Sequence, residues 1–237
     1  MNLDGSTALV TGANRGLGRH FAEQLRQRGA KVYAAARRPE LVDLPGVEAV
    51  RLDITDEASV AEAAALAGDV DLLVNNAAST AGGNLITGEM DAIRDVMDSN
   101  YWGTLAMIRA FAPVLARNGG GAILNVLSAV AWTTIDGNTA YAAAKSAAWG
   151  LTNAARVELA GQGTHVAALV PGPTATETML AFAESAGVAL APDAANDPAD
   201  LVRLALDGLQ AGEIEILDRY GREAKAALAG PPRAFVL

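Results

Sequence analysis

Thr11-Gly-Ala-Asn-Arg-Gly-Leu-Gly18 is the stretch that decides the fold, because it separates a short apolar run, 7–10, from a periodic segment, 20–28. A strand, a glycine turn and a helix in this order are typical of a phosphate-binding unit. Glycine lets the backbone approach a pyrophosphate closely, and free N–H groups at a helix start attract anions. The turn therefore predicts a dinucleotide site, with a purely structural turn as the alternative.

Short buried strands and helices alternate along the rest of the chain. Strands are predicted at 31–36, 47–52, 71–74, 122–127, 165–170 and 213–217, and helices at 56–67, 89–116 and 141–160. Pro113 is expected to kink the long helix or to end it early. The alternation predicts an α/β fold with a parallel sheet wound on both faces. No linker divides the chain, so 1–237 is expected to be one domain.

Composition excludes several classes of protein. A chain of 237 residues that is 51% hydrophobic has a sizeable core, and its net charge of −9 argues against nucleic-acid and membrane partners. It has no cysteine, which excludes disulfides and thiolate chemistry and fits a reducing compartment. His20 and His165 are isolated, so no metal site is expected. Without a visible signal segment or membrane span, a cytoplasmic location is expected.

Tyr141 and Lys145 stand four residues apart at the head of an alanine-rich helix. Residues i and i+4 share a helix face, so the phenol and the ammonium can serve one site. A free tyrosine has a pKa of about 10, and a nearby ammonium is expected to lower it toward a range useful for proton transfer. A functionless pair on a helix surface is the alternative.

The residues after the second strand select the cofactor. NAD sites usually place an acid there for the ribose 2′-OH, whereas NADP sites place arginine for the extra phosphate. Here the strand ends in Arg37-Arg38, with no carboxylate before Glu40, and Arg15 can add a second cation. NADP(H) is therefore preferred and NAD(H) possible, with solvated surface arginines as the alternative.

Polar residues also stand where predicted strands end. Asp53 can accept from an adenine amino group, with a helix cap or a salt bridge as the alternative. Asn75-Asn-Ala-Ala78 can bracket a ribose, or form a turn. Ser128 can hydrogen-bond a substrate carbonyl, or cap a helix. Asn100 is unfavourable inside a helix, which indicates a specific polar task.

In order and spacing these motifs resemble the short-chain dehydrogenase/reductase family, in its single-domain branch. They are Thr11–Gly18, Asp53, Asn75–Ala78, Asn100, Ser128, Tyr141–Lys145 and Pro171–Thr176. The resemblance implies a three-layer Rossmann fold with a doubly wound parallel seven-stranded sheet, and hydride transfer between a nicotinamide and a carbonyl or alcohol. Ala78 departs from the family's usual glycine, a mild change that is expected to preserve activity.

The resemblance also implies residue roles. Tyr141 would donate a proton to the substrate oxygen that Ser128 holds, Lys145 would also bond the nicotinamide ribose, and Asn100 would fix a water that links Lys145 to solvent. The implied cofactor-binding residues are Gly12, Asn14, Arg15, Gly16, Leu17, Gly18, Arg37, Arg38, Asp53, Ile54, Asn76, Ala77, Ala78, Tyr141, Lys145, Pro171, Gly172, Thr174 and Thr176.

Residues 175–197 correspond to the family's substrate lid. Their loose composition and Met179 suggest a mobile flap over an apolar ketone or aldehyde, and the expected substrate pocket is Ser128, Trp132 and Met179. The expected activity is that of a carbonyl reductase or alcohol dehydrogenase. A catalytically silent nucleotide-sensing or scaffold protein is the alternative.

By the same resemblance, the long helices beginning near Glu89 and Tyr141 form the usual dimer surface. The small residues along the second of these helices would let two copies approach closely. A homo-oligomer, either a dimer or a tetramer, is therefore expected.

Overall fold

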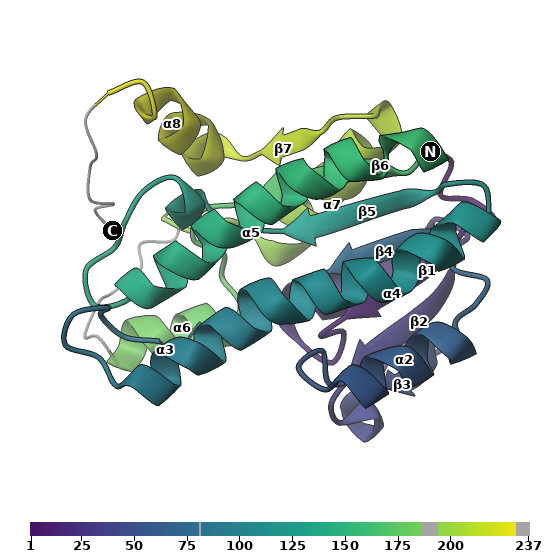
Figure 1. Ribbon diagram of the computed structural model, residues 1–237, viewed down its shortest axis with the longest axis horizontal. Helices are drawn as coiled ribbons and strands as arrows, with labels where there is room; N and C mark the ends of the chain where they lie inside the picture. Colours follow the sequence, from purple (N-terminus) through teal and green to yellow (C-terminus); the bar gives the residue numbers. More distant parts are fainter. Residues whose placement is uncertain (81, 186–193, 231–237) are drawn as a thin grey trace.

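The computed structural model describes residues 1–80, 82–185 and 194–230. Its centre is a parallel sheet (Figure 1). The strands are β1 (Thr7–Thr11), β2 (Lys31–Ala36), β3 (Glu48–Arg51), β4 (Leu72–Asn75), β5 (Ala122–Val126), β6 (His165–Val170) and β7 (Glu215–Leu217). They are ordered β3-β2-β1-β4-β5-β6-β7, and every pairing is parallel. The predicted seven-stranded Rossmann sheet is confirmed.

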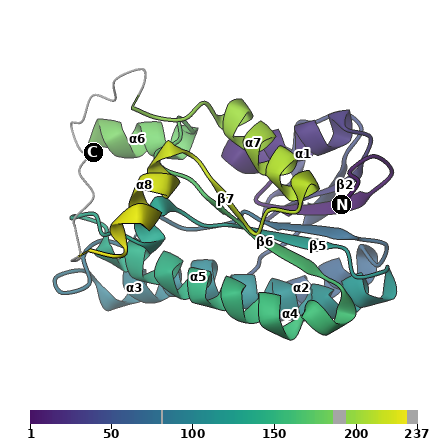
Figure 2. The same cartoon turned by 90° about the horizontal axis from the view of Figure 1, so that it is seen from above.

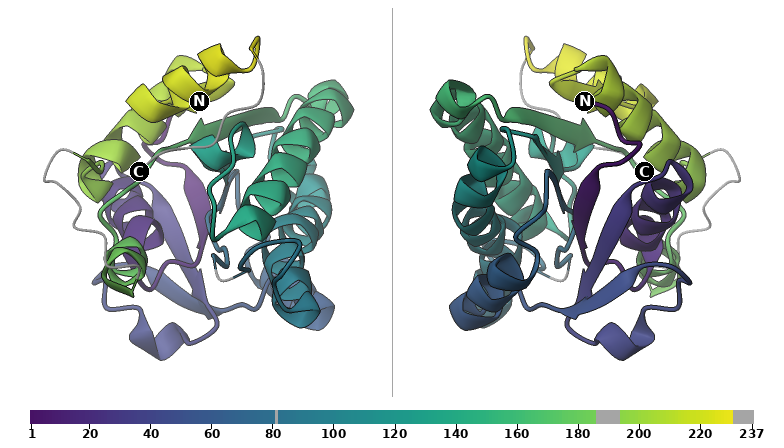
Figure 3. Two further views of the ribbon diagram at one scale, coloured as in Figure 1. Left: turned by 90° about the vertical axis from the view of Figure 1, so that its left-hand side faces the viewer. Right: turned by 90° about the vertical axis from the view of Figure 1, so that its right-hand side faces the viewer.

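Helices cover both faces of the sheet and make three layers (Figures 2 and 3). One face carries α1 (Gly16–Gln27) and α7 (Pro198–Ala211). The opposite face carries α2 (Glu57–Leu66), α4 (Gly103–Arg117) and α5 (Thr139–Glu158). Successive side chains of a strand point to opposite faces, so both layers need apolar residues from each strand.

The central strand β1 shows how the two layers are held. Ala8 and Val10 are fully buried and pack in the same cluster as Phe21 of α1. Leu9, between them, packs in the cluster of Phe111 on α4. Because both faces of β1 are covered, its apolar run is nearly continuous, and its carboxyl end is fixed from both sides.

The helix predicted over 89–116 consists of three successive segments. They are α3 (Met90–Met97), a π-helical turn (Asp98–Trp102) and α4. Single π turns inside helices frequently mark functional sites, and this one contains Asn100. Pro113 neither ends the helix nor limits it, since α4 continues to Arg117.

The structure contains three helices after β6 that the sequence analysis did not predict. They are α6 (Glu177–Ser185), α7 and α8 (Arg219–Ala227). The start of α7 carries readable signals, because Asp197 accepts hydrogen bonds from the N–H groups of Ala199 and Asp200 at 2.8 and 3.0 Å. Of the expected lid over 175–197, residues 186–193 lie outside the described residues.

Candidate active site

A cleft of about 1020 Å³ runs along the carboxyl ends of the strands. Residues after β2 and β3 line one end, the turn after β1 lies in the middle, and the end of β5 and the start of α5 line the other end. The loop after β6 reaches back to the turn, since a Cβ on Gly16 would lie 3.5 Å from the Thr176 side chain. Because β1 lies between β2 and β4, successive crossovers leave it in opposite directions. Ligands of open α/β sheets bind at such a switch point.

The glycines of the turn have different tasks. Gly12 and Gly16 line the cleft with φ of 67° and 52°, a region that favours glycine. A Cβ on Gly12 would lie 3.1 Å from the Ala77 Cα. Gly18 does not belong to the lining, and a methyl group there would overlap the Gly12 carbonyl. Gly18 therefore lets α1 pack against the turn and does not itself face a ligand.

Thr11 joins the ends of β1 and β4. Its Oγ1 accepts hydrogen bonds from the N–H groups of Asn76 and Ala77, both at 2.9 Å. The Asn76 side chain donates in return to the Thr11 carbonyl at 2.9 Å. Sequence reasoning gave Thr11 no role, although a threonine at the end of a buried strand is a readable signal for such a bridge.

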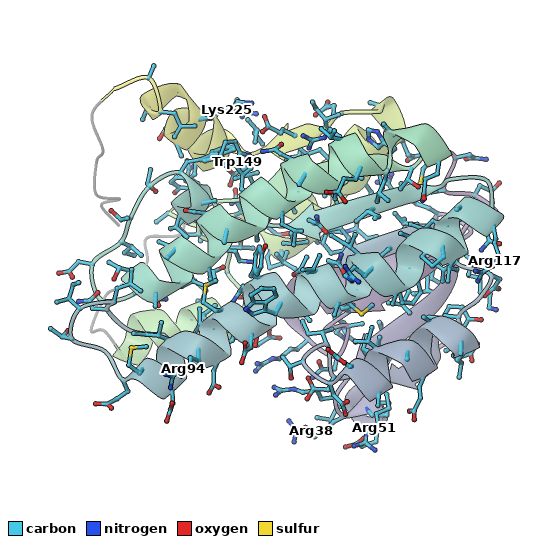
Figure 4. All side chains as sticks on the ribbon, in the orientation of Figure 1. Arg38, Arg51, Arg94, Arg117, Trp149 and Lys225 are labelled. Atoms are coloured by element: carbon cyan, nitrogen blue, oxygen red, sulfur yellow. The ribbon has the colours of Figure 1, made fainter. Side chains whose placement is uncertain are left out.

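Three exposed arginines, Arg15, Arg37 and Arg38, line the end of the cleft beyond β2. Figure 4 shows Arg38 at the same corner of the molecule as Arg51 of β3. An anionic group placed here would meet several guanidinium groups, which bind phosphate well.

Asp53 lies within this cationic end of the cleft. Partial burial acts to raise its pKa, but hydrogen bonds from the Thr55 hydroxyl and N–H, and the charges of Arg37 and Arg51, lower the pKa overall. The alternative of a helix cap does not apply, because Asp56 caps α2. Asp53 is thus an ionised acceptor on the cleft wall.

Ser128, Tyr141 and Lys145 meet at the other end of the cleft. Ser128 follows β5, and the other two lie one turn apart on α5. Lys145 is 4% exposed; its Nζ donates to the Val126 carbonyl at 2.9 Å and lies 5.6 Å from the centre of the Tyr141 ring. Residues from two separate elements therefore form one acid–base group.

The pKa values of this group differ from the expectation. Burial raises the pKa of Tyr141 to about 12, although its hydrogen bond with Ser128 acts in the opposite direction. Burial lowers the pKa of Lys145 to about 8. The expected lowering of the phenol pKa by Lys145 is not seen, because loss of hydration disfavours phenolate more strongly. Tyr141 consequently holds its proton at neutral pH, as a proton donor must.

Asn100 lies behind the cleft and outside its lining. It is 2% exposed, and its Nδ2 donates to the carbonyls of Ser79 and Val96 at 2.7 and 2.9 Å. Its Oδ1 is buried and has no hydrogen-bond partner among the described residues. Buried amide oxygens are usually paired, so this acceptor fits an ordered water.

Trp132 is not among the described residues that line the cleft. Its ring packs edge-to-face on Trp149, with centroids 6.0 Å apart, and Lys225 lies over it at 5.8 Å. Figure 4 shows Trp149 and Lys225 together, near α8. Its packing on α5 and α8 does not support the expected substrate role of Trp132, whereas Met179 does line the cleft.

The cleft brings the other predicted residues together. Those present in its lining are Gly12, Asn14, Arg15, Gly16, Leu17, Arg37, Arg38, Asp53, Ile54, Asn76, Ala77, Ala78, Ser128, Tyr141, Lys145, Pro171, Gly172, Thr174, Thr176 and Met179. Residues that sequence reasoning missed include Val130, Ile135 and Asn138 near Tyr141. They lie in the irregular segment between β5 and α5, where no periodic pattern marks them.

The residues of the cleft fit a dinucleotide. The Gly12–Gly16 turn leaves room at the N-terminus of α1, and the arginines can hold phosphate. In the described part of the chain no cluster of three or more His, Asp or Glu residues could hold a metal. No described helix is long and apolar enough to cross a bilayer.

Known proteins resemble this chain in sequence and structure. A family model for short chain dehydrogenases matches residues 6–186. The NADPH-dependent 1-acyldihydroxyacetone phosphate reductase of Schizosaccharomyces pombe is 34% identical over 178 residues, which are 71% of this chain and 60% of that protein. This chain therefore spans less than two thirds of that reductase.

The sorbitol dehydrogenase of Cereibacter sphaeroides is 37% identical over 183 residues, which are 73% of this chain and 72% of that protein. The crystal structure of a short chain dehydrogenase from Burkholderia cenocepacia in complex with NADP has a TM-score of 0.88 at 37% identity. It covers 97% of this chain and 95% of its own.

Proposed function

The chain belongs to the short-chain dehydrogenase/reductase family of NAD(P)-dependent oxidoreductases, and on that premise we propose that it is an NADP(H)-dependent carbonyl reductase for hydrophobic ketones or aldehydes. The meeting of Ser128, Tyr141 and Lys145 in the same cleft as the glycine turn and the arginines carries the proposal. A silent nucleotide sensor would have no need of a buried lysine beside a protonated tyrosine.

The preference for NADP(H) rests on charge. Arg15, Arg37 and Arg38 stand where a ribose 2′-phosphate would lie, and no carboxylate directly follows β2. Asp53, the acid nearest to them in the lining, already accepts two hydrogen bonds from Thr55 on one oxygen. NAD(H) would fit the same cleft without using the arginines, so we expect it to bind more weakly.

The catalytic roles follow from protonation and position. When bound, the reduced nicotinamide supplies a hydride to the carbonyl carbon. Tyr141, which is protonated at neutral pH, donates its phenolic proton to the carbonyl oxygen. Ser128 donates a hydrogen bond to the same oxygen, which stabilises its developing charge. The ammonium of Lys145 stabilises the phenolate left behind.

Asn100 completes the proposed proton path. Its free, buried Oδ1 can accept from a water, and its Nδ2 is fixed by two carbonyls, so the acceptor cannot exchange places with the donor. We propose that a water at this position passes a proton back toward Lys145 and Tyr141.

The substrate class follows from the lining near Tyr141. The lining contains the apolar Val130, Ile135 and Met179 and the carboxylates Asp95 and Asp98, whereas its basic residues other than Lys145 lie at the nucleotide end. An uncharged apolar ketone therefore fits better than a phosphorylated one. Segment 175–197 would close over it, with Met179 of α6 on its inner side.

A panel of ketones, aldehydes and alcohols, offered with NADPH, NADH and their oxidised forms, tests the proposal. Loss of NADPH absorbance should be fastest with neutral apolar ketones and should depend on Tyr141. Binding of NADPH without any turnover across the panel would favour the silent nucleotide-sensing alternative. A preference for charged sugars or sugar phosphates would overturn the substrate class.

We also propose that the chain forms a homo-oligomer through the α4 and α5 face. Trp102, in the π turn, is 55% exposed and Val157, on α5, is 78% exposed. Light scattering tests this, and a monomer at micromolar concentration would contradict it. A cytoplasmic location stays a prediction, supported by the absence of cysteine and tested by cell fractionation.

A further inference from the structure

Asp218 is a buried carboxylate that the catalytic scheme above does not use. It directly follows β7 and is 5% exposed. Among the described residues, the buried side chains of a charged type are those of Asp218 and Lys145. Its Oδ1 accepts from the Gly221 N–H at 2.7 Å, which caps α8. Its Oδ2 accepts from the Gly172 N–H at 2.8 Å and from the Asn196 side chain at 2.5 Å.

The first of these partners lies on the cleft wall. Gly172 lies between Pro171 and Pro173, and proline has no N–H. The Gly172 N–H is thus the only backbone donor of this turn, and Asp218 receives it. The ring of Tyr220 lies against Gly172 from the same side, because a methyl group on Gly172 would overlap it. The turn is held from behind by two residues at the start of α8.

The second partner lies at the end of the proposed lid. The Asn196 N–H and side chain both donate to the Pro173 carbonyl, at 2.8 and 3.0 Å, and its own carbonyl accepts from the Ala175 N–H at 3.0 Å. Asn196 also forms a parallel bridge with Thr174. The segment Gly172–Ala175 and Asn196 therefore lie side by side, and Asp218 accepts hydrogen bonds from both.

Helix capping alone does not account for this arrangement. A cap needs one acceptor oxygen, and the other aspartate caps, Asp56 and Asp197, are exposed. Burying a carboxylate is unfavourable unless its oxygens are hydrogen-bonded, and Asp218 has its second oxygen occupied entirely by the cleft wall and the lid end.

We propose that Asp218 is a positioning residue that fixes the Gly172–Thr174 wall beside the nicotinamide and joins it to Asn196. This inference rests on the proposed function, since it assumes that the wall faces the reacting ring. Asp218 acts through Gly172 and Asn196, and it touches neither substrate nor cofactor. Without it, the wall can shift relative to Tyr141 while the nucleotide end stays intact.

Asp218→Ser tests the inference against a matched control. Serine still caps α8, but it is too short to reach Gly172 and Asn196 at the same time. We expect kcat to fall by about tenfold or more, because small misplacements of reacting groups slow catalysis strongly, with the KM for NADPH within about threefold of wild type. Asp56→Ser makes the same change at the exposed cap of α2, outside the cleft lining and the lid, and should leave both constants near wild type.

Amide hydrogen exchange gives a readout that does not need turnover. Because Pro171 and Pro173 have no N–H, the Gly172 amide is the only one of this turn, and residue-resolved exchange measured by NMR should show it exchanging faster in Asp218→Ser than in wild type or Asp56→Ser. If Asp218→Ser fails to fold, Asn196→Ala removes the side-chain bonds from Asn196 to Asp218 and Pro173 and leaves the bond from the Gly172 N–H in place. It should lower kcat with the KM for NADPH near wild type, and a wild-type kcat would contradict the inference.

The outcomes separate the two claims. A wild-type kcat and unchanged exchange in Asp218→Ser would show a helix cap only and overturn the inference. Wild-type protein that oxidises no NADPH would overturn the proposed function, while exchange at Gly172 would still decide whether Asp218 holds the wall. A loss of kcat accompanied by an equal loss of NADPH affinity would also contradict the inference, since it would indicate general damage.

Discussion

The two ends of the cleft are built in different ways. The nucleotide end comes from the turn between β1 and α1 and the residues just after β2 and β3, each a short continuous motif. The catalytic end joins the end of β5, the first turns of α5, the loop after β6 and, from behind, the start of α8. Glycine geometry and exposed arginines form the first end, whereas buried and half-buried polar side chains form the second.

This difference indicates which properties should be separable. Exposed charges at the nucleotide end act locally and can be changed without disturbing the fold. Lys145 has a lowered pKa, Asn100 has an unpaired buried oxygen, and Asp218 has several hydrogen-bond partners at once. Changes at these buried residues should therefore alter chemistry and stability together. Binding of the cofactor and turnover should therefore respond to different substitutions.

Tyr141→Phe should give the largest difference between the effect on turnover and the effect on cofactor binding. Removing the proton donor is expected to lower kcat by about 10²- to 10⁴-fold, the usual contribution of a general acid, while NADPH affinity stays within a few-fold. Fluorescence titration with NADPH and steady-state turnover measure the two effects. Tyr101→Phe, which removes a hydroxyl outside the described lining, should change neither. Substantial turnover in Tyr141→Phe would move the chemistry elsewhere.

Arg37→Asp should weaken cofactor binding at the nucleotide end of the cleft. Losing one charged contact to a 2′-phosphate is expected to weaken NADPH binding by about 10- to 100-fold, with NADH affected by less than about threefold. Arg117→Asp makes the same charge change at the end of α4, away from Arg38 (Figure 4), and serves as the control. Equal weakening of NADPH and NADH in Arg37→Asp would refute the assignment of a phosphate site.

Lys145 should make stability depend on pH. Its pKa of about 8 in the folded protein lies below the usual value of 10.5, so between these values the unfolded chain binds more protons and stability rises with pH. From pH 7 to pH 9 wild type should gain about 1 kcal/mol in unfolding free energy relative to Lys145→Met. Tyr141, with its pKa raised, should oppose this only above pH 10.

Urea unfolding of both proteins at pH 7 and pH 9 measures this difference. Parallel pH dependence in wild type and Lys145→Met would mean that Lys145 is not desolvated as the structure has it.

Ala78→Gly should have the smallest effect. Ala78 is exposed on the cleft lining, so removing its methyl group leaves no cavity. We expect kcat and KM for NADPH to change by less than about threefold in steady-state assays. A tenfold improvement would show that this methyl group crowds the cofactor.

The same difference explains what could be predicted from the sequence. The alternation of strands and helices along the chain predicts the sheet, and short contiguous motifs predict the residues of the nucleotide end, because residues close in sequence form that end. The packing of Trp132 on Trp149 instead of the cleft could not be predicted, since it depends on where β7 and α8 return. Asp218 was missed for the same reason: its partners lie 46 and 22 residues away.

The pKa of Tyr141 was predicted in the wrong direction for a related reason. Helical spacing placed Lys145 beside it correctly, but spacing says nothing about how much protein covers both groups. Burial raises the pKa of the phenol and lowers that of the amine. The three helices after β6 were missed although α7 has a readable cap, because the Ala/Gly/Pro-rich composition before it suggested a loop.

The structure of the complex with NADP⁺ is the most direct measurement of the central claim. The account predicts the 2′-phosphate beside Arg37 and Arg38, and the nicotinamide ring between the Gly172–Thr174 wall and the Tyr141 hydroxyl, with Lys145 within reach of its ribose. A dinucleotide bound with its nicotinamide ring away from Tyr141, or no binding at millimolar NADP⁺, would contradict it.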